Sequence, residues 1–263
     1  MYFIDYHNHT QMSFDATYPL TQMARAMAEA GIREMCVTDH CDLVDEHARR
    51  VYSFDWDAAL AQYDQALADL GDRLVIKQGL EFGMGHLDPP CSETILNQPR
   101  LDFVIGSVHN YSPRKGCGDF YLSDMSTPEA CAEILEDYFY SLDALCRTPY
   151  YDILGHVIYP LRYMNGNATI HPWMDQVSEI LRVVIESGRG IEVNTYCGRT
   201  VEDWIPVLRR YKELGGEILT VGSDAHHPEN AGRGIPQAYD LLRSLGFRWI
   251  CTYEKRKPTF MEL

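Results

Sequence analysis

Hydrophobic and polar residues follow two different periods along this chain. Short runs rich in β-branched and aromatic residues predict strands, and longer segments with apolar residues three and four positions apart predict helices. Strands are expected over residues 2–7, 33–38, 73–80, 101–108, 150–155, 190–194, 216–222 and 247–252. Helices are expected over residues 19–30, 56–70, 127–146, 172–187, 201–214 and 234–245, with a shorter one near 91–98. This alternation is typical of β/α units around a parallel sheet.

Glycines support the predicted helix ends. They stand just past the last apolar position of four helices, where a left-handed residue often ends the helix. These glycines are Gly31, Gly71, Gly188 and Gly215. The connections near residues 40–55, 82–100 and 109–126 are long, and long loops in compact domains are commonly functional.

The length of the chain fits one α/β barrel. Barrels of this class reach 263 residues without division, and no repeat or linker rich in Pro, Gly and Ser interrupts the sequence. Apolar residues make up 46% and charged residues 23%, which is ordinary for a globular protein with a large core. We therefore interpret residues 1–263 as a single barrel domain.

The net charge of −15 narrows the choice of partners. Lys and Arg form no extended run, so nucleic acid is not expected as a partner, since cationic contacts to phosphate dominate such binding. No apolar stretch approaches 18 residues, and the N-terminus lacks the pattern of a signal peptide, so no membrane association is expected. The eight cysteines form no C-x-x-C pair, and a reducing cytoplasm is the expected location.

Ligand-type residues concentrate at the ends of the predicted strands. Six of the ten histidines and three carboxylates occupy or closely follow the C-terminal end of a strand. They are His7, His9, Asp15, His40, Glu81, His109, His156, Asp224 and His226. In a barrel all parallel strands point these ends to one face, which carries the active site. Residues distant in sequence are therefore expected to converge.

This convergence predicts a metal centre. His7 and His9 are two positions apart on an extended segment, so both side chains project to the same side and can bind one ion together. A mixed set of imidazoles and carboxylates favours Zn, Mn or Fe. Nine ligands are too many for one ion, so two or three are expected, with Glu81 bridging a pair. Such pairs activate water and stabilise displacement at phosphorus.

The ordered set of these residues resembles the polymerase and histidinol phosphatase (PHP) superfamily. The resemblance runs from His7 to His226 and includes the segment Thr38 to Asp42 (TDHCD). It implies a distorted (β/α)7 TIM-like barrel with a trinuclear site. By analogy His7, His9, Glu81 and Asp224 hold one metal, Glu81, His109 and His156 a second, and Asp15, His40 and His226 a third. Some relatives have His in place of Asp15, and an oxygen ligand there favours a harder ion or a weaker site.

Within the superfamily the chain looks most like the monofunctional histidinol-phosphate phosphatases of histidine biosynthesis. Arg162 and Arg199 lie in two late loops at positions that match phosphate-binding arginines of the family. The resemblance implies hydrolysis of a phosphomonoester, L-histidinol phosphate, by a metal-bound hydroxide while both arginines neutralise charge. Asp224, His226 and a water on the third metal are all candidates for protonating the leaving alcohol.

The binding of the leaving group and the exact activity stay open at this point. The cationic amine of histidinol calls for carboxylates outside the metal shell, and Asp42 and Glu46, in the expected loop after His40, are the nearest in sequence. Alternatives are another phosphoesterase of the superfamily, such as a protein-tyrosine phosphatase or a general phosphatase. An exonuclease or a non-catalytic metal-binding protein fits less well. The sequence does not indicate an oligomeric state.

Overall fold

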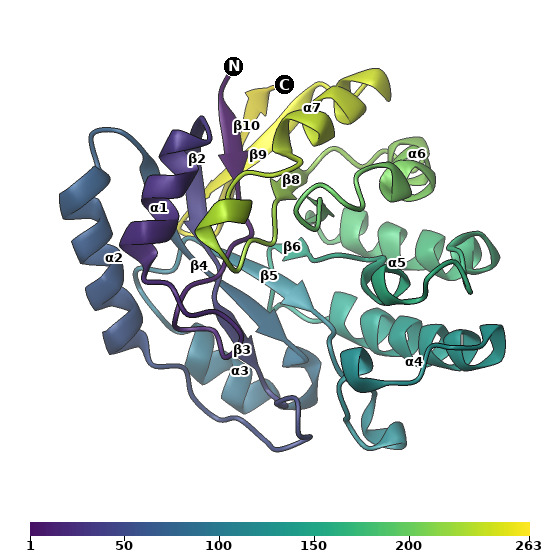
Figure 1. Ribbon diagram of the computed structural model, residues 1–263. Helices are drawn as coiled ribbons and strands as arrows, with labels where there is room; N and C mark the ends of the chain where they lie inside the picture. Colours follow the sequence, from purple (N-terminus) through teal and green to yellow (C-terminus); the bar gives the residue numbers. More distant parts are fainter.

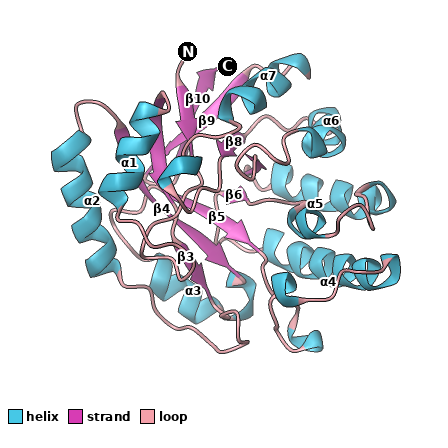
Figure 2. Cartoon of the chain, in the orientation of Figure 1, coloured by secondary structure: helices cyan, strands magenta, loops and turns pink.

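A computed structural model describes residues 1–263 and shows a parallel sheet that curls into a barrel with helices outside it (Figures 1 and 2). Seven strands follow one another in the order β1-β2-β4-β5-β6-β7-β8, and β3 pairs with β4 beside this path. The strands are β1 (Phe3–Asp5), β2 (Ile32–Val37), β3 (His40–Asp42), β4 (Val75–Gly83), β5 (Phe103–Ser107), β6 (Ile153–Leu154), β7 (Gly190–Asn194) and β8 (Leu219–Gly222).

Backbone hydrogen bonds join the first strand to the last and bring the barrel close to closure. The Tyr6 amide donates to the Val221 carbonyl at 2.9 Å, and the Asp224 amide donates to the His7 carbonyl at 2.8 Å. Asn8 and Ala225 form a parallel bridge just beyond these bonds. Because β6 has only two residues, the barrel is irregular on that side. The predicted distorted seven-stranded α/β barrel is confirmed.

Seven helices pack around the sheet. They are α1 (Leu20–Glu29), α2 (Trp56–Leu70), α3 (Pro89–Leu96), α4 (Pro128–Cys146), α5 (Met174–Glu186), α6 (Ile205–Glu213) and α7 (Ile235–Ser244). All seven were expected from the apolar spacing. Gly31, Gly188 and Gly215 adopt positive φ after their helices, as predicted. Gly71 also follows the last residue of α2, as predicted, but with a right-handed φ of −56°.

A C-terminal hairpin lies outside the parallel sheet. It consists of β9 (Trp249–Glu254) and β10 (Lys257–Glu262), which pair antiparallel. The turn between them contacts the starts of β5 and β6: the Lys255 amide donates to Asp102 Oδ1 at 2.9 Å, and Arg256 Nε lies 2.9 Å from Asp152 Oδ2. The expected strand at residues 247–252 exists, but as part of this hairpin at the N-terminal end of the barrel.

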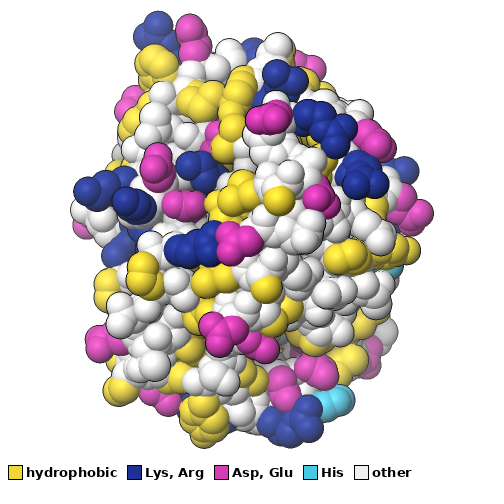
Figure 3. All heavy atoms as spheres, turned by 90° about the vertical axis from the view of Figure 1, so that its left-hand side faces the viewer, with side chains coloured by type: hydrophobic (Ala, Val, Ile, Leu, Met, Phe, Trp, Pro, Cys, Tyr) yellow, Lys and Arg dark blue, Asp and Glu magenta, His cyan; other side chains and the backbone are white.

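The opposite, C-terminal end of the barrel carries the long loops. The loop after β4 contains 3-10 helix at Gly85–Leu87, the loop after β5 at Pro113–Lys115 and Phe120–Leu122, and the loop after β6 at Tyr159–Tyr163. The face over α1 and α2 shows Lys and Arg side chains interspersed with Asp and Glu (Figure 3). No helix is both long and apolar enough to cross a membrane.

Candidate metal centre

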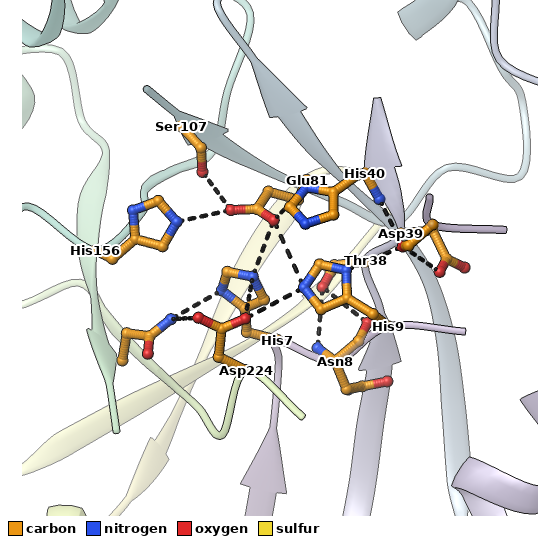
Figure 4. Close-up of polar contacts among 12 residues, drawn as sticks. His7, Asn8, His9, Thr38, Asp39, His40, Glu81, Ser107, His156 and Asp224 are labelled. Atoms are coloured by element: carbon orange, nitrogen blue, oxygen red, sulfur yellow. Dashed lines mark hydrogen bonds and ion pairs between the residues drawn. The ribbon is translucent and has the colours of Figure 1, made fainter. Parts of the chain in front are cut away.

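Glu81 lies at the centre of a cluster of five histidines. The strand register explains this convergence, since β3, β4 and β5 run side by side and His40 pairs directly with Glu81. Glu81 Oε2 lies 3.0 Å from His40 Nδ1, 3.2 Å from His7 Nε2 and 3.6 Å from His9 Nε2. Glu81 Oε1 lies 2.8 Å from His156 Nε2 and 3.2 Å from His109 Nε2. Figure 4 shows His7, His9, His40 and His156 around this carboxylate.

Asp224 and Asp15 extend the cluster on the side of His9. Asp224 Oδ1 lies 3.3 Å from His9 Nε2 and 3.5 Å from His7 Nε2. Asp15 Oδ2 lies 3.1 Å from His226 Nε2 and 3.7 Å from His40 Nε2. The His9 ring stacks against His226 at 4.0 Å and against His40 at 4.3 Å between centroids. The structure thus brings together all nine ligand-type residues that the sequence indicated.

Orphaned polar atoms at the centre fit divalent metal ions. His7 Nε2, His9 Nε2, His40 Nδ1 and Glu81 Oε2 are buried and have no hydrogen-bond partner. Buried polar atoms without partners are rare and costly, and these four converge on one another. Four overlapping sets of three ligand atoms lie within 4.8 Å: His7, His9 and Asp224; His7, Glu81 and His156; His9, His40 and His226; His40, Asp42 and His109. Imidazole and carboxylate donors at this spacing suit a divalent metal centre.

The electrostatics keep the main carboxylates ionised. Burial alone would raise the pKa of Glu81, but His7, His40 and His109 hold it well below its ordinary value. Burial opposes ionisation of Asp224 too, yet His7 and Arg162 keep its pKa well below the usual range. Burial lowers the pKa of His9 to about 3, so its imidazole is neutral. Ionised Glu81 and Asp224 and the neutral His9 are therefore in the protonation states that bind metal. The nearby carboxylates raise the pKa values of His7, His40 and His109, so a metal that binds these histidines displaces their protons.

Glu192, at the middle of β7, supports two of the histidines and was not found from the sequence. Its side chain is 1% exposed, with Oε1 2.6 Å from His7 Nδ1, and Oε2 accepts a 3.0 Å hydrogen bond from the His156 amide. A carboxylate on the outer nitrogen of a ligand histidine fixes its tautomer and orientation. Asn194 donates to Glu192 at 3.2 Å and to Asp224 at 3.1 Å. The signal in the sequence that could have indicated Glu192 is its position as an acidic residue within the apolar run 190–194.

Asp39, in the TDHCD segment, holds the loop after β1 in place. It accepts hydrogen bonds from the Thr10 amide at 2.6 Å and from Ser13 Oγ at 2.7 Å. Ser13 Oγ in turn lies 3.1 Å from His9 Nδ1 and accepts from the His40 amide at 3.0 Å. Asp39 therefore orients two histidines without facing the metal centre itself.

Asp42 lies beside the histidines and not in a loop outside them. Its Oδ1 is 2.7 Å from His109 Nδ1, and its Oδ2 is 3.4 Å from His40 Nδ1. The expected loop position is wrong because residues 40–42 form β3 and pair with β4, which turns Asp42 toward the barrel interior. Glu46 does lie in the following loop, on the wall of the cavity described next.

A cavity of about 700 Å3 opens over the cluster. Its lining includes Glu81, Asp224, Glu46, Arg162 and Tyr196. The side chain of Arg162 is 3% exposed and donates from Nη1 to Asp224 Oδ2 at 2.8 Å. Arg199 is exposed and does not line the cavity; its guanidinium lies over the Tyr196 ring, 5.0 Å from the centroid. The phosphate-binding role of both arginines stays a prediction.

Comparisons with known proteins agree with this geometry. The PHP domain family model matches residues 5–196. A probable histidinol-phosphatase of Clostridium acetobutylicum is 26% identical, with 96% of this chain and 97% of the relative covered. A histidinol-phosphatase of Lactococcus lactis is 27% identical over 97% of this chain and 95% of the relative. The crystal structure of histidinol phosphate phosphatase from Lactococcus lactis, complexed with Zn, L-histidinol and phosphate, superposes with a TM-score of 0.80 at 26% identity over 98% of both chains.

Proposed function

The chain belongs to the PHP domain family, and from this premise we propose that it hydrolyses L-histidinol phosphate to L-histidinol and phosphate. The observation that carries the proposal is the cluster around Glu81, where the ligand-type side chains converge beneath one cavity. Full-length similarity to histidinol-phosphatases supports the same substrate. The similar solved structure holds zinc, L-histidinol and phosphate, the two products of this reaction among them.

We propose two or three divalent ions, zinc, manganese or iron, as cofactors. His7, His9, Glu81 and Asp224 hold the first, and Glu81, His109 and His156 the second. Asp15, His40 and His226 hold the third. Asp15 is the most exposed of these ligands, at 38%, which supports the weakest binding at the third position. Such ions, when bound, lower the pKa of water and neutralise charge at phosphorus.

The protein's own residues orient the phosphomonoester. Arg162 faces the cavity beside Asp224, where its remaining N–H groups are available to phosphate oxygens. Its pKa is raised above the ordinary value because Asp224 outweighs the effect of burial, so the guanidinium stays charged. Arg199, whose guanidinium lies over the Tyr196 ring outside the cavity, is proposed to reach the phosphate from that side. Together they neutralise the charge that develops during displacement.

Two residues are proposed for protonating the leaving alcohol. Asp224 already accepts hydrogen bonds from Arg162 and Asn194 and stays ionised, which makes it a poor proton donor. The His226 ring is 24% exposed and lines the cavity, so it can meet the leaving oxygen directly or through water. We therefore favour His226 over Asp224 while the third metal position is empty; with an ion there, His226 would be its ligand, and a water on that ion would be the candidate instead.

Acidic residues on the cavity wall suit the cationic leaving group. Glu46 and Asp119 both line the cavity and are only partly exposed. Neither carboxylate pairs with a Lys or Arg of the chain, and the contact of Glu46 Oε1 is with Nε2 of the exposed His47, at 3.5 Å. An amine on the departing alcohol supplies the missing positive charge. Glu46 is proposed to bind this amine, with Asp42, deeper in the same cavity, as the second candidate, because His109 pairs with its Oδ1 while its Oδ2 has no hydrogen-bond partner.

Initial rates on a panel of phosphomonoesters test the function. The panel holds L-histidinol phosphate, a phosphotyrosine peptide and p-nitrophenyl phosphate, with metal content measured on the same preparation. We expect kcat/KM to be highest for L-histidinol phosphate. A preference for the phosphotyrosine peptide would instead establish a protein-tyrosine phosphatase, and degradation of single-stranded DNA an exonuclease. The expected cytoplasmic location and the absence of a nucleic-acid partner stay predictions.

A further inference from the structure

Arg162, which lines the cavity, and Arg199, which lies outside it, are held in very different ways. Arg162 is buried and fixed by its hydrogen bond to Asp224. No hydrogen bond or ion pair joins the Arg199 guanidinium to the rest of the chain. Its guanidinium carbon instead lies 5.0 Å from the centroid of the Tyr196 ring, and that of Arg162 lies 4.5 Å from the same ring. One aromatic ring therefore contacts both cations.

The backbone that presents Tyr196 is strained. Tyr196 has a φ of 44° and Cys197 a φ of 54°, and Gly198 follows with 87°. Consecutive left-handed residues that are not glycine are uncommon and cost free energy, so they persist only where the surrounding structure imposes them. This conformation sets the direction of the Tyr196 side chain at the cavity wall.

Hydrogen bonds on both sides hold this strained segment in place. The Tyr196 amide donates to Asn194 Oδ1 at 2.9 Å, and the Cys197 amide donates to the Ser223 carbonyl at 2.8 Å. The same Asn194 donates through Nδ2 to Asp224 Oδ2, which also accepts from Arg162. One amide side chain thus connects the Tyr196 turn to the Asp224–Arg162 pair.

We propose that Tyr196 is a positioning residue that keeps Arg199 beside Arg162 for joint binding of the phosphate group. Two guanidinium groups repel each other, and the negative face of an aromatic ring offsets that repulsion. A free Arg199 side chain would instead spread over many rotamers in solvent, and ordering it would weaken phosphate binding. The inference rests on the proposed phosphomonoesterase function and adds Tyr196 to its phosphate-binding machinery.

Four variants test the role of the ring: Tyr196→Leu, Tyr196→Phe, Arg199→Ala and the double variant Tyr196→Leu/Arg199→Ala. Tyr140→Leu is the matched control. The Arg114 guanidinium carbon lies 3.9 Å from the centroid of the Tyr140 ring, and neither residue lines the cavity. The measurements are kcat/KM on the best phosphomonoester, the rise in Tm that inorganic phosphate produces, and metal content. The thermal readout reports phosphate binding independently of turnover.

We expect Tyr196→Leu to lower kcat/KM about 3- to 30-fold, the range of a cation–π contact from exposed to desolvated. The rise in Tm with phosphate should shrink, metal content should stay parental, and Tyr196→Phe should recover most of the loss because it keeps the ring. In the Arg199→Ala background, Tyr196→Leu should lower kcat/KM much less, because the guanidinium that the ring positions is already absent.

Three results would overturn the inference. The first is a parental kcat/KM in Tyr196→Leu. The second is a fold-loss of kcat/KM in the double variant that equals the product of the fold-losses in the two single variants. The third is a loss of kcat/KM in Tyr196→Leu that reduced metal content explains. A parent that hydrolyses no phosphomonoester and gains no stability from phosphate would refute the proposed function itself. A parent that turns over normally while Tyr196→Leu matches Tyr140→Leu would refute only the role of Tyr196.

Discussion

Single side chains behind the ligands decide how the ligands are oriented, and Glu192 is the strongest case. Glu192→Gln keeps the shape of the side chain and removes the charge that faces His7 Nδ1. We expect metal affinity or kcat/KM to fall about 10- to 100-fold, as for other carboxylates behind ligand histidines. Glu34→Gln is the control, since Glu34 is also a buried acid but contacts Tyr2 and Tyr6. Equal metal affinity in both variants would exclude this role for Glu192.

The arginines give a second prediction at the residue scale. Hydrogen bonds between charged groups contribute roughly 1.5–3 kcal/mol, so Arg162→Ala or Arg199→Ala should lower kcat/KM about 10- to 150-fold. Inorganic phosphate should inhibit both variants less than the parent, with metal content unchanged. Arg114→Ala, on the outer surface, serves as control. Parental kcat/KM together with parental phosphate inhibition would remove these arginines from the site.

His86 links stability to pH. Its Nδ1 is buried without a partner, and burial lowers its pKa from 6.5 to about 4. Between these pH values His86 is protonated in the unfolded chain but neutral in the folded protein. The contribution of His86 to the free energy of unfolding is therefore complete above pH 6.5 and is lost as pH falls toward 4. His86→Phe should lose less free energy of unfolding than the parent between pH 7 and 5. Urea unfolding measures this, with exposed His171→Gln as control; parallel losses in His86→Phe and parent would contradict it.

The sequence reveals ligands better than the residues that support them. Histidines are uncommon enough that their recurrence at strand ends indicates convergence, as for His109 and His156. Glu192 and Asn194 belong to an apolar strand, where a single acid or amide has many explanations. Only the three-dimensional contact between Glu192 and His7 separates a supporting carboxylate from a buried structural acid such as Glu34.

At the scale of elements, long amphipathic helices were predicted well and short strands poorly. α2 begins and ends at the predicted residues: the Asp55 side chain accepts from the Ala58 amide at its start, and Gly71, the predicted stop, follows its last residue. β3 was missed because its three residues, His40–Asp42, carry two ionisable side chains and read as loop. β10 was missed because it is mostly exposed and contains Pro258. Its pairing with β9, and not periodicity, makes it a strand.

The hairpin gives a prediction that separates stability from activity. Tyr6 Oη donates to Glu34 and accepts from the Tyr253 amide at 2.9 Å, and Tyr6 does not line the cavity. Tyr6→Phe leaves both buried partners unsatisfied and should lower the free energy of unfolding by about 1–3 kcal/mol. Tyr2→Phe, which removes a more exposed bond to the same Glu34, should cost less. Denaturant unfolding and kcat/KM on each variant are the measurements; a large loss of kcat/KM in folded Tyr6→Phe would show that the hairpin end influences the site.

Over the whole molecule, the two ends of the barrel have different tasks. The hairpin packs aromatic rings against the N-terminal end, where the centroid of the Phe103 ring lies 5.0 Å from that of Tyr6 and 4.8 Å from that of Tyr253. The C-terminal end gathers the histidines and carboxylates, and the proposed metal ions would offset the negative charge of these carboxylates. Because the apolar core lies between these ends, the fold should survive loss of the metals while the activity does not.

Metal removal and return test the central claim, that this cluster hydrolyses a phosphomonoester through bound metal ions. The protein is dialysed against a strong chelator, checked for metal content and for circular dichroism, and then titrated with Zn or Mn. The initial rate on L-histidinol phosphate is followed throughout. We predict no turnover in the metal-free protein, a largely retained spectrum, and activity that returns in proportion to two or three ions per chain. Full activity in verified metal-free protein would contradict the account.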